Sequence, residues 1–148
     1  MIKPVCVMSE NMQEYKYDKV MVVDDSDTDL YVAEHYLKKY FVAADVIFAE
    51  SAAEGLDYLL QYADSIEKLP SIIFLDIRMP VMDGFEFLDK YEKLPSSVHE
   101  HCTIIMLSSS ADPRDHERIK KNPFVKKFIN KPLNKEKLQE LLLANITQ

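Results

Sequence analysis

The sequence contains only two glycines, and this scarcity excludes one common class of site. Gly55 and Gly84 stand far apart in a chain of 148 residues. A loop that cradles the phosphates of a nucleotide needs several glycines close together, because its backbone must approach the phosphates closely. We therefore do not expect this chain to bind a nucleotide through a glycine-rich loop.

Cysteines and long apolar runs are scarce as well. Cys6 and Cys102 are the only cysteines and form no C-x-x-C pair, so neither a disulfide framework nor a zinc site is indicated. We interpret both as buried, inert thiols. No apolar stretch reaches the length of a signal-peptide core or a membrane span. A cytoplasmic location and the absence of a membrane partner are therefore expected.

A surplus of positive charge is also lacking. The chain has 18 Lys and Arg against 25 Asp and Glu, which gives a net charge of -7. Binding to a nucleic-acid backbone or to an anionic membrane surface depends on a surplus of basic side chains. On this ground we exclude nucleic acid as a partner, and a cation or a positively charged protein surface suits the chain better.

The residues that are present have the composition of a globular protein. Hydrophobic residues make up 47% of the chain and charged residues 29%. The length fits one domain with its own core. We assign residues 18–148 to this domain and residues 1–17 to an N-terminal extension. A loose tail is the favoured interpretation of the extension, although its apolar residues 5–8 leave an added strand, a helix or a dimer contact open.

Five short apolar runs have the length of β-strands, and segments with helical spacing separate them. The runs are residues 20–23, 46–49, 72–75, 104–107 and, more weakly, 125–129. Ser51 and Asn134 are typical N-caps of the helices that follow them. Continuous apolar strands that alternate with helices predict an α/β fold, with a doubly wound, five-stranded parallel sheet and helices on both faces.

Polar residues follow these runs at the points where the strands end. An open parallel sheet binds ligands beyond the carboxyl ends of its strands, where the strand order reverses. Asp24 and Asp25 follow the first run, Asp76 the third, Ser108 the fourth and Lys131 the fifth. With strand order 2-1-3-4-5, these five side chains would meet at one edge of the sheet.

The chemistry of this group indicates a metal ion and a phosphoryl group. Three crowded carboxylates repel one another unless a cation lies among them, and oxygen ligands suit a hydrated Mg²⁺ ion. Once the charge is lowered, one carboxylate can act as a nucleophile toward a phosphoryl group. Lys131, Ser108 and the metal ion can then contact the phosphoryl oxygens.

Four motifs give the chain a resemblance to a known family. They are Val22-Val23-Asp24-Asp25, the stretch FLDIRMPVMDG from Phe74 to Gly84, Ile105-Met106-Leu107-Ser108, and Lys131-Pro132, in this order. In these motifs the chain resembles the receiver domains of two-component response regulators, including the single-domain chemotaxis type. The resemblance runs from Lys19 to the C-terminus, and it implies a flavodoxin-like fold with strand order 2-1-3-4-5.

The resemblance also implies roles for individual residues. Asp76 would accept a phosphoryl group from a sensor histidine kinase or a histidine phosphotransfer protein. Mg²⁺ would be held by Asp24, Asp25, Asp76 and the backbone carbonyl of Arg78. Lys131 would pair with a carboxylate at rest and with a phosphoryl oxygen afterwards, and a cis peptide bond to Pro132 would follow it.

A switch is implied in the same way. Ser108 would move to bond the phosphoryl group, and Phe128 would rotate into the vacated space, which alters the face formed by residues 112–122, 126–130 and 134–144. Arg78 and Ser110 would tune the lifetime of the phosphoryl group, with a sign that the sequence does not give. The output, docking on a target protein or draining phosphoryl groups from a kinase, stays open. We do not expect an enzyme that acts on an external substrate.

Two other functions compete with this one. A haloacid-dehalogenase-like phosphohydrolase would use Asp25 as its nucleophile, and Asp25-Ser26-Asp27 resembles its opening motif. However, Asp29 stands where that motif requires Thr or Val, and no segment is left to enclose a substrate. A pseudo-receiver, which binds partners without being phosphorylated, usually lacks the acceptor, an acid or the lysine, and all of these are present here.

Two metal-site patterns are rejected. Alternating acids from Asp25 onward resemble a calcium-binding loop, but Leu30 stands at the position of its glycine and Tyr36 at that of its glutamate. His99 and His101 fall in a predicted polar loop without another ligand beside them, so we interpret them as ordinary loop residues.

Overall fold

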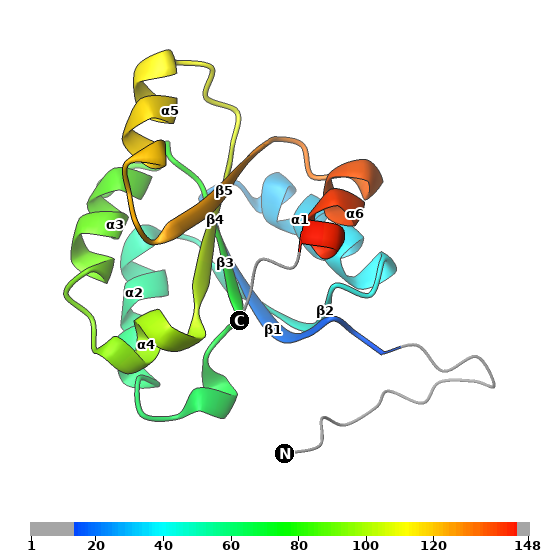
Figure 1. Ribbon diagram of the computed structural model, residues 1–148, viewed down its shortest axis with the longest axis horizontal. Coiled ribbons are helices and arrows are strands. Elements are labelled where there is room, and N and C mark those ends of the chain that lie inside the picture. The colour runs from blue at the N-terminus through cyan, green and yellow to red at the C-terminus, as the bar shows by residue number, and fades with distance from the viewer. Residues whose placement is uncertain (1–13, 145–148) are drawn as a thin grey trace.

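The computed structural model describes residues 14–144, in which helices cover both faces of a central sheet (Figure 1). The strands are β1 (Tyr17–Val23), β2 (Ala43–Ala49), β3 (Ile72–Leu75), β4 (Thr103–Ser108) and β5 (Val125–Asn130). The helices are α1 (Asp27–Lys39), α2 (Ala52–Gln61), α3 (Gly84–Tyr91), α4 (Ser96–His101), α5 (Pro113–Lys120) and α6 (Lys135–Ala144), with a 3-10 helix at Ile66–Lys68. None of the helices in this range has the length and apolar character that crossing a membrane requires.

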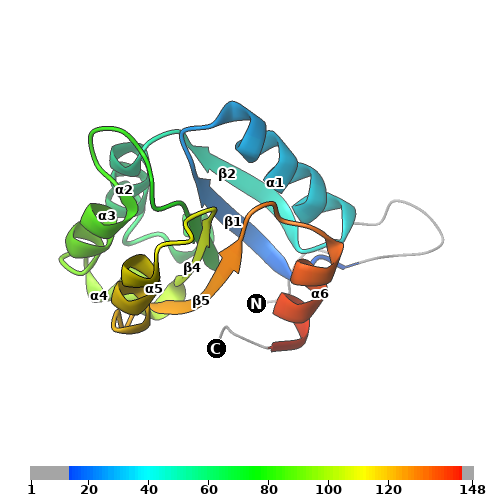
Figure 2. The ribbon, with the colours of Figure 1, turned by 90° about the horizontal axis from the view of Figure 1, so that it is seen from above.

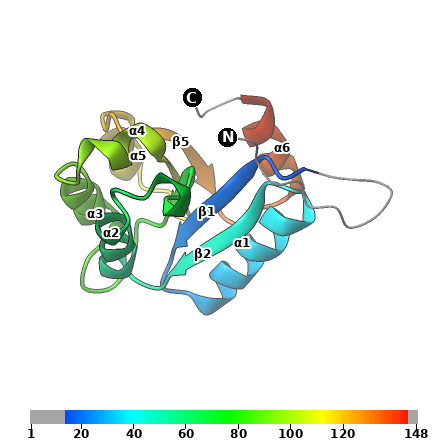
Figure 3. The same ribbon diagram turned by 90° about the horizontal axis from the view of Figure 1, so that it is seen from below.

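The five strands form one parallel sheet in the order β2-β1-β3-β4-β5, as predicted. Helices α1 and α6 lie on one face, and α2 to α5 lie on the other (Figures 1 and 2). Seen from below, α1 runs beside β1 and β2 (Figure 3). The strand order reverses between β1 and β3, so the carboxyl ends of these two strands mark the place where this fold class binds ligands.

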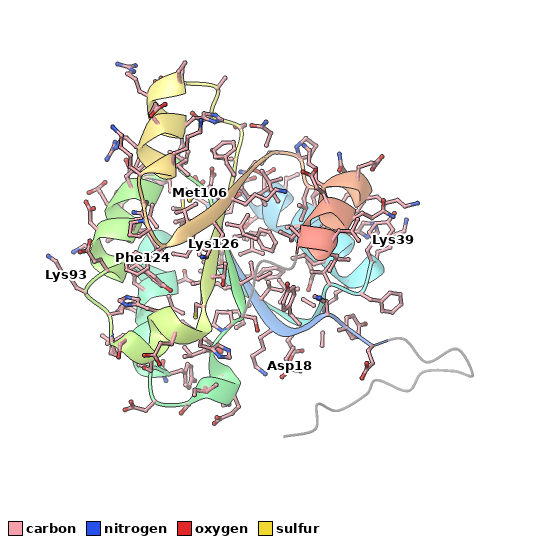
Figure 4. All side chains as sticks on the ribbon, in the orientation of Figure 1. Asp18, Lys39, Lys93, Met106, Phe124 and Lys126 are labelled. Atoms are coloured by element: carbon pink, nitrogen blue, oxygen red, sulfur yellow. The ribbon has the colours of Figure 1, made fainter. Side chains whose placement is uncertain are left out.

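The three central strands are buried on both faces, which explains their continuous apolar sequences. In β1, Met21 and Val23 belong to the core beneath α2 to α5, whereas Val20 and Val22 belong to the core beneath α1 and α6. Met106 of β4 lies in the first of these cores, among the side chains between the sheet and the helices (Figure 4). The edge strands β2 and β5 are partly exposed. The sheet thus separates two apolar cores.

The two predicted helix caps are confirmed. Ser51 Oγ accepts a hydrogen bond of 3.1 Å from the Glu54 N–H, and Asn134 Oδ1 accepts one of 3.0 Å from the Lys137 N–H. These bonds satisfy N–H groups that have no partner within the first turn of a helix. They fix the points at which α2 and α6 begin.

One short helix was not predicted, and it contains the histidines that were assigned to a loop. His99 lies in α4, where its Nε2 is 2.7 Å from the carbonyl oxygen of Tyr91. Its ring centroid lies 4.9 Å from that of Tyr91 and 4.6 Å from that of Phe124. Ser97 adds a hydrogen bond of 2.7 Å to the carbonyl of Ala63. The loop prediction for His99 and His101 is therefore wrong, because ring contacts hold a helix that has little apolar periodicity.

Cys102 is buried, and its burial raises the pKa of the thiol to about 12. A thiol with such a pKa is not ionised near neutral pH and is therefore unreactive, as predicted. Cys6 and the apolar residues 5–8 of the extension lie outside the described residues. The interpretations of these positions stay predictions.

Gly84 brings the first turn of α3 against the backbone that carries Asp76. The Gly84 N–H donates a hydrogen bond of 2.8 Å to the carbonyl of Ile77. A Cβ atom at this position would overlap the carbonyl oxygen of Asp76 and would lie 2.9 Å from the Cα of Ile77. Both are backbone atoms that cannot rotate away. Glycine is required here because the two backbone segments approach each other closely.

We expect Gly84→Ala to lower the free energy of unfolding by about 1 to 3 kcal/mol, the usual cost of overpacking. Urea unfolding followed by circular dichroism measures this change. Lys90→Ala is the matched control, because Lys90 is exposed in the same helix, and it should change the value by less than about 0.5 kcal/mol. Equal unfolding midpoints for the two variants would contradict the assigned role of Gly84.

Candidate functional site

Three carboxylates meet where β1 and β3 end. Asp24 and Asp25 follow β1, and Asp76 follows β3. One oxygen of each lies within 4.8 Å of the others. Asp24 and Asp76 are buried, with 2% and 6% of their surfaces exposed, whereas Asp25 is exposed. The structure therefore brings these three acids together, as the sequence predicted.

The ammonium group of Lys131 lies among the carboxylates. Its Nζ is 2.6 Å from Asp24 Oδ2, 2.7 Å from Asp29 Oδ2 and 3.1 Å from Asp76 Oδ2. Lys131 follows β5 directly, and its own N–H donates a hydrogen bond of 3.1 Å to the carbonyl of Ser108. The peptide bond from Lys131 to Pro132 is cis, as predicted.

The environment shifts the pKa of two of these groups. Burial has the largest influence on Lys131 and by itself lowers its pKa, but hydrogen bonds to Asp24 and Asp29 and the charge of Asp76 leave the pKa above its ordinary value. Burial raises the pKa of Asp24, against the lowering effect of the hydrogen bond from Lys131. Lys131 is therefore charged at neutral pH.

Backbone groups hold the side chain of Asp76. Its Oδ1 accepts a hydrogen bond of 2.8 Å from the Ile77 N–H, and its own N–H donates one of 3.1 Å to the carbonyl of Val23. With Oδ2 facing Lys131, both carboxylate oxygens have a defined direction. Such a carboxylate is positioned to react with an electrophile without having to be reordered first.

The remaining predicted residues surround this centre. Ser108 is buried at the end of β4, and its Oγ accepts a hydrogen bond of 3.3 Å from the Ser110 N–H. Phe128 lies in β5, half-buried, with its ring 4.1 Å from that of His116 in α5. The side chain of Arg78 forms an ion pair with Asp115. The roles assigned to these residues stay predictions.

The acidic cluster has the donor atoms that a divalent cation needs. Carboxylate oxygens are the preferred ligands of Mg²⁺ and Ca²⁺. The Lys131 ammonium contacts Asp24, Asp29 and Asp76. Asp25 clusters with two of these acids, so the four carboxylates carry more negative charge than this one ammonium balances. Asp24, Asp25 and Asp76 can hold a cation, whereas the part of the Arg78 carbonyl in such a site stays a prediction.

Sequence reasoning missed two carboxylates of this region. Asp29 lies in the first turn of α1, and the sequence analysis considered it only in the two rejected motifs, as a mismatch to the phosphohydrolase motif and as one of the alternating acids of the calcium-binding pattern. Asp115 lies in α5 with 5% of its surface exposed. A signal for Asp115 was available, because it stands four residues before the buried Ile119 and thus on the same side of the helix. An acid within the apolar stripe of a helix indicates a buried partner.

Comparisons with known proteins agree with this geometry. A family model described as the response regulator receiver domain matches residues 20–143. Protein PilG of Pseudomonas aeruginosa is 37% identical over 130 residues, which cover 86% of this chain and 87% of PilG. The chemotaxis protein CheV3 of Helicobacter pylori is 32% identical over 104 residues, which cover 69% of this chain but only 33% of CheV3.

Solved structures show the same fold. A response regulator receiver protein from Dyadobacter fermentans has a TM-score of 0.75 at 34% identity and is covered to 98%, with 88% of this chain aligned. A two-component response regulator from Cytophaga hutchinsonii has a TM-score of 0.79 at 26% identity, with 87% of this chain and 96% of that chain covered. Nothing in these comparisons supports the haloacid-dehalogenase-like alternative.

We expect MgCl₂ to stabilise the protein, because the ion would offset repulsion between the clustered carboxylates. Thermal unfolding measures the effect, which reaches about 2.7 kcal/mol when the magnesium concentration is about 100 times the Kd. Asp25→Asn should remove most of this response. Asp27→Asn is the matched control, because Asp27 is exposed two residues further on and is not part of the cluster. An equal magnesium response in both variants would show that the cluster does not bind the ion.

Proposed function

This chain belongs to the response regulator receiver domain family, and we propose that it is a phosphorylation-activated switch whose Asp76 accepts the phosphoryl group. One observation carries the proposal. Asp76 is a buried carboxylate at a strand end, 3.1 Å from a lysine ammonium and clustered with two further acids. This arrangement orients a nucleophile and supplies positive charge beside it.

The residues of the chain supply most of the chemistry. A carboxylate oxygen of Asp76 forms a bond to phosphorus while the bond between phosphorus and the donor breaks. The hydrogen bond from the Ile77 N–H fixes the orientation of the acceptor. Lys131, which already contacts Asp76 Oδ2, donates to a phosphoryl oxygen and stabilises the charge that collects on it.

A magnesium ion bound at this edge would supply further positive charge to the phosphoryl oxygens. Asp24, Asp25 and Asp76 would hold it together with the carbonyl of Arg78. The clustering of the three carboxylates supports this assignment. Asp24 is also tied to the start of α1, since its Oδ1 accepts a hydrogen bond of 2.9 Å from the Ser26 N–H, so its position is fixed before an ion arrives.

The phosphoryl donor is a sensor histidine kinase or a histidine phosphotransfer protein, and the proposed setting is the cytoplasm. The proposed boundary places residues 1–17 in the extension and 18–148 in the domain, although Tyr17 is itself the first residue of β1. The downstream target is a protein. The chain carries out its own phosphorylation and dephosphorylation and is not an enzyme for an external substrate. The family match at residues 20–143 supports the phosphoryl donor, the protein target and the role as a switch.

The switch passes from Ser108 to the face made by α5, β5 and α6. The Ser108 hydroxyl turns to the phosphoryl group, and the ring of Phe128 rotates inward. Next to Phe128 lies a hollow that is lined by His116, Ile119, Lys120, Val125, Lys126 and Lys127. Lys126 lies at the surface of β5 on this face (Figure 4). Rotation of Phe128 changes the shape of this hollow, which supports its use as the target-binding surface.

Incubation with acetyl phosphate tests the acceptor directly. We expect wild-type protein to gain one phosphoryl group by intact mass in the presence of MgCl₂ and none in its absence. Asp76→Asn should abolish the gain, because an amide is a poor nucleophile toward phosphorus. Labelling that survives in Asp76→Asn but disappears in Asp25→Asn would instead favour the phosphohydrolase alternative.

Ser108→Ala tests both roles proposed for the Ser108 hydroxyl, in phosphorylation and in switching. A hydroxyl that bonds a charged phosphoryl oxygen contributes about 1.5 to 3 kcal/mol, so its removal should slow labelling about tenfold or more. It should also abolish the phosphorylation-dependent shift of the Phe128 ring resonances in NMR spectra. Ser109→Ala is the control, because Ser109 is exposed in the same loop. A normal Phe128 shift in Ser108→Ala would refute the coupling.

A further inference from the structure

One buried carboxylate connects the two loops that flank the acceptor. Asp115 Oδ2 accepts hydrogen bonds from Arg78 Nη2 and, at 2.7 Å, from Ser110 Oγ. The Asp115 side chain is 7% exposed, whereas that of Arg78 is 62% exposed. Arg78 therefore lies across the surface, and its charged end is held by an acid that is anchored in the protein.

The two residues bonded to Asp115 lie in the loops that follow two neighbouring strands, β3 and β4. Arg78 stands two residues after Asp76, and Ser110 stands two residues after Ser108. Strands β3 and β4 pair in parallel, with Leu75 opposite Met106, so the two loops leave the sheet side by side. The side chains that border the acceptor on this side thus meet on one oxygen of Asp115.

The next residue of α5 strengthens the attachment. His116 Nε2 lies 3.1 Å from the carbonyl oxygen of Ser110, and its ring packs on that of Phe128. The first turn of α5 therefore contacts the 108–112 loop through two consecutive side chains. A substitution at Asp115 would therefore alter the contacts of this loop and of Arg78. Lys131 and the acidic cluster make no described bond to Asp115, so their contacts would remain.

We propose that Asp115 is a positioning residue that sets the lifetime of the phosphoryl group by holding Arg78 and Ser110 away from it. The inference rests on the proposed function, in which Asp76 is phosphorylated. Loss of the group is a hydrolysis: a water oxygen bonds to phosphorus, the bond between phosphorus and the Asp76 oxygen breaks, and the products are the free carboxylate and dihydrogen phosphate. Water must reach the side of phosphorus opposite Asp76, near the loops that carry Arg78 and Ser110.

The sign follows from the charges. The Asp115 carboxylate carries the negative charge that pairs with the Arg78 guanidinium. While this ion pair is formed, the guanidinium does not block the approach of water to the phosphorus atom. Asp115→Asn removes that charge, so the guanidinium is free to pair with the phosphoryl group, which has two negative charges and three acceptor oxygens. A guanidinium lying on the phosphoryl group covers the approach of water and slows hydrolysis. In this way Asp115 shortens the lifetime of the phosphoryl group on Asp76.

A double-mutant cycle on the hydrolysis rate tests the inference. Wild type, Asp115→Asn, Arg78→Gln and the double variant are labelled with acetyl phosphate, freed of the donor, and followed by intact mass. Asp115→Asn should slow hydrolysis by about threefold or more, in keeping with couplings between contacting residues. In the Arg78→Gln background the same substitution should have no such effect. The initial labelling rate should change little, which a general defect in folding would not allow.

Asp112→Asn is the matched control. Asp112 also lies at the start of α5 and pairs with an arginine, Arg114, but its side chain forms no described hydrogen bond or ion pair with Arg78 or Ser110. Its N–H donates a hydrogen bond of 3.4 Å to Ser110 Oγ, which the substitution leaves in place, and the charge of Arg78 acts on Asp112 only from a distance. Asparagine caps a helix as well as aspartate does. The hydrolysis rate of Asp112→Asn should therefore equal that of wild type. Unchanged or faster hydrolysis in Asp115→Asn, or the same slowing in both backgrounds, would overturn the inference. Absence of any labelling in wild type would instead mean that the proposed function has failed.

Discussion

The ammonium group of Lys131 is the interaction on which the arrangement of this site depends. It lies within 3.1 Å of carboxylates from the ends of β1 and β3 and from the first turn of α1. Buried charges destabilise a protein unless oppositely charged groups compensate them. Lys131 compensates Asp24 and Asp76 at once, while its backbone N–H binds β4 through Ser108. One residue therefore joins the carboxyl ends of all three central strands to the end of β5.

The charge around the hollow beside Phe128 is opposite in sign to the net charge of the chain. The chain as a whole has a net charge of -7. The hollow beside Phe128 is nevertheless lined by three lysines, Lys120, Lys126 and Lys127. Total charge governs solubility and long-range steering, whereas the groups around a surface decide which partner fits it. The composition therefore says little about the target of this face.

The sequence was sufficient to predict the parts of the fold that depend on apolar runs and strand ends. Ile72–Leu75 was predicted to the residue, because β3 is buried on both faces and polar residues bound it. The position of Asp24, Asp25 and Asp76 followed from the strand order. Strand β1 begins earlier than its apolar run because Tyr17 and Lys19 pair with β2. Such pairing depends on a partner strand, which periodicity does not reveal.

The interactions that escaped prediction are those between side chains distant in sequence. Asp29 meets Lys131 across 102 positions, and Arg78 meets Asp115 across 37. The sequence around each of these residues does not indicate its distant partner. Helix α4 was missed because rings from α3 and from the segment before β5 hold it in place. Tertiary contacts of this kind override local preference.

The two ends of α5 are fastened differently, and this limits how the helix can move. Near its far end, Arg118 stacks on the ring of Phe85 at 3.7 Å, and Phe124 just beyond the helix contacts Tyr91 and His99. Its first turn is fastened by polar bonds of Asp115 and His116 to Ser110, in the loop that follows β4. Packed rings resist sliding more than exchangeable hydrogen bonds do. Under the proposed function, a small displacement beside Asp76 would therefore tilt α5 about its aromatic end rather than slide the helix along the sheet.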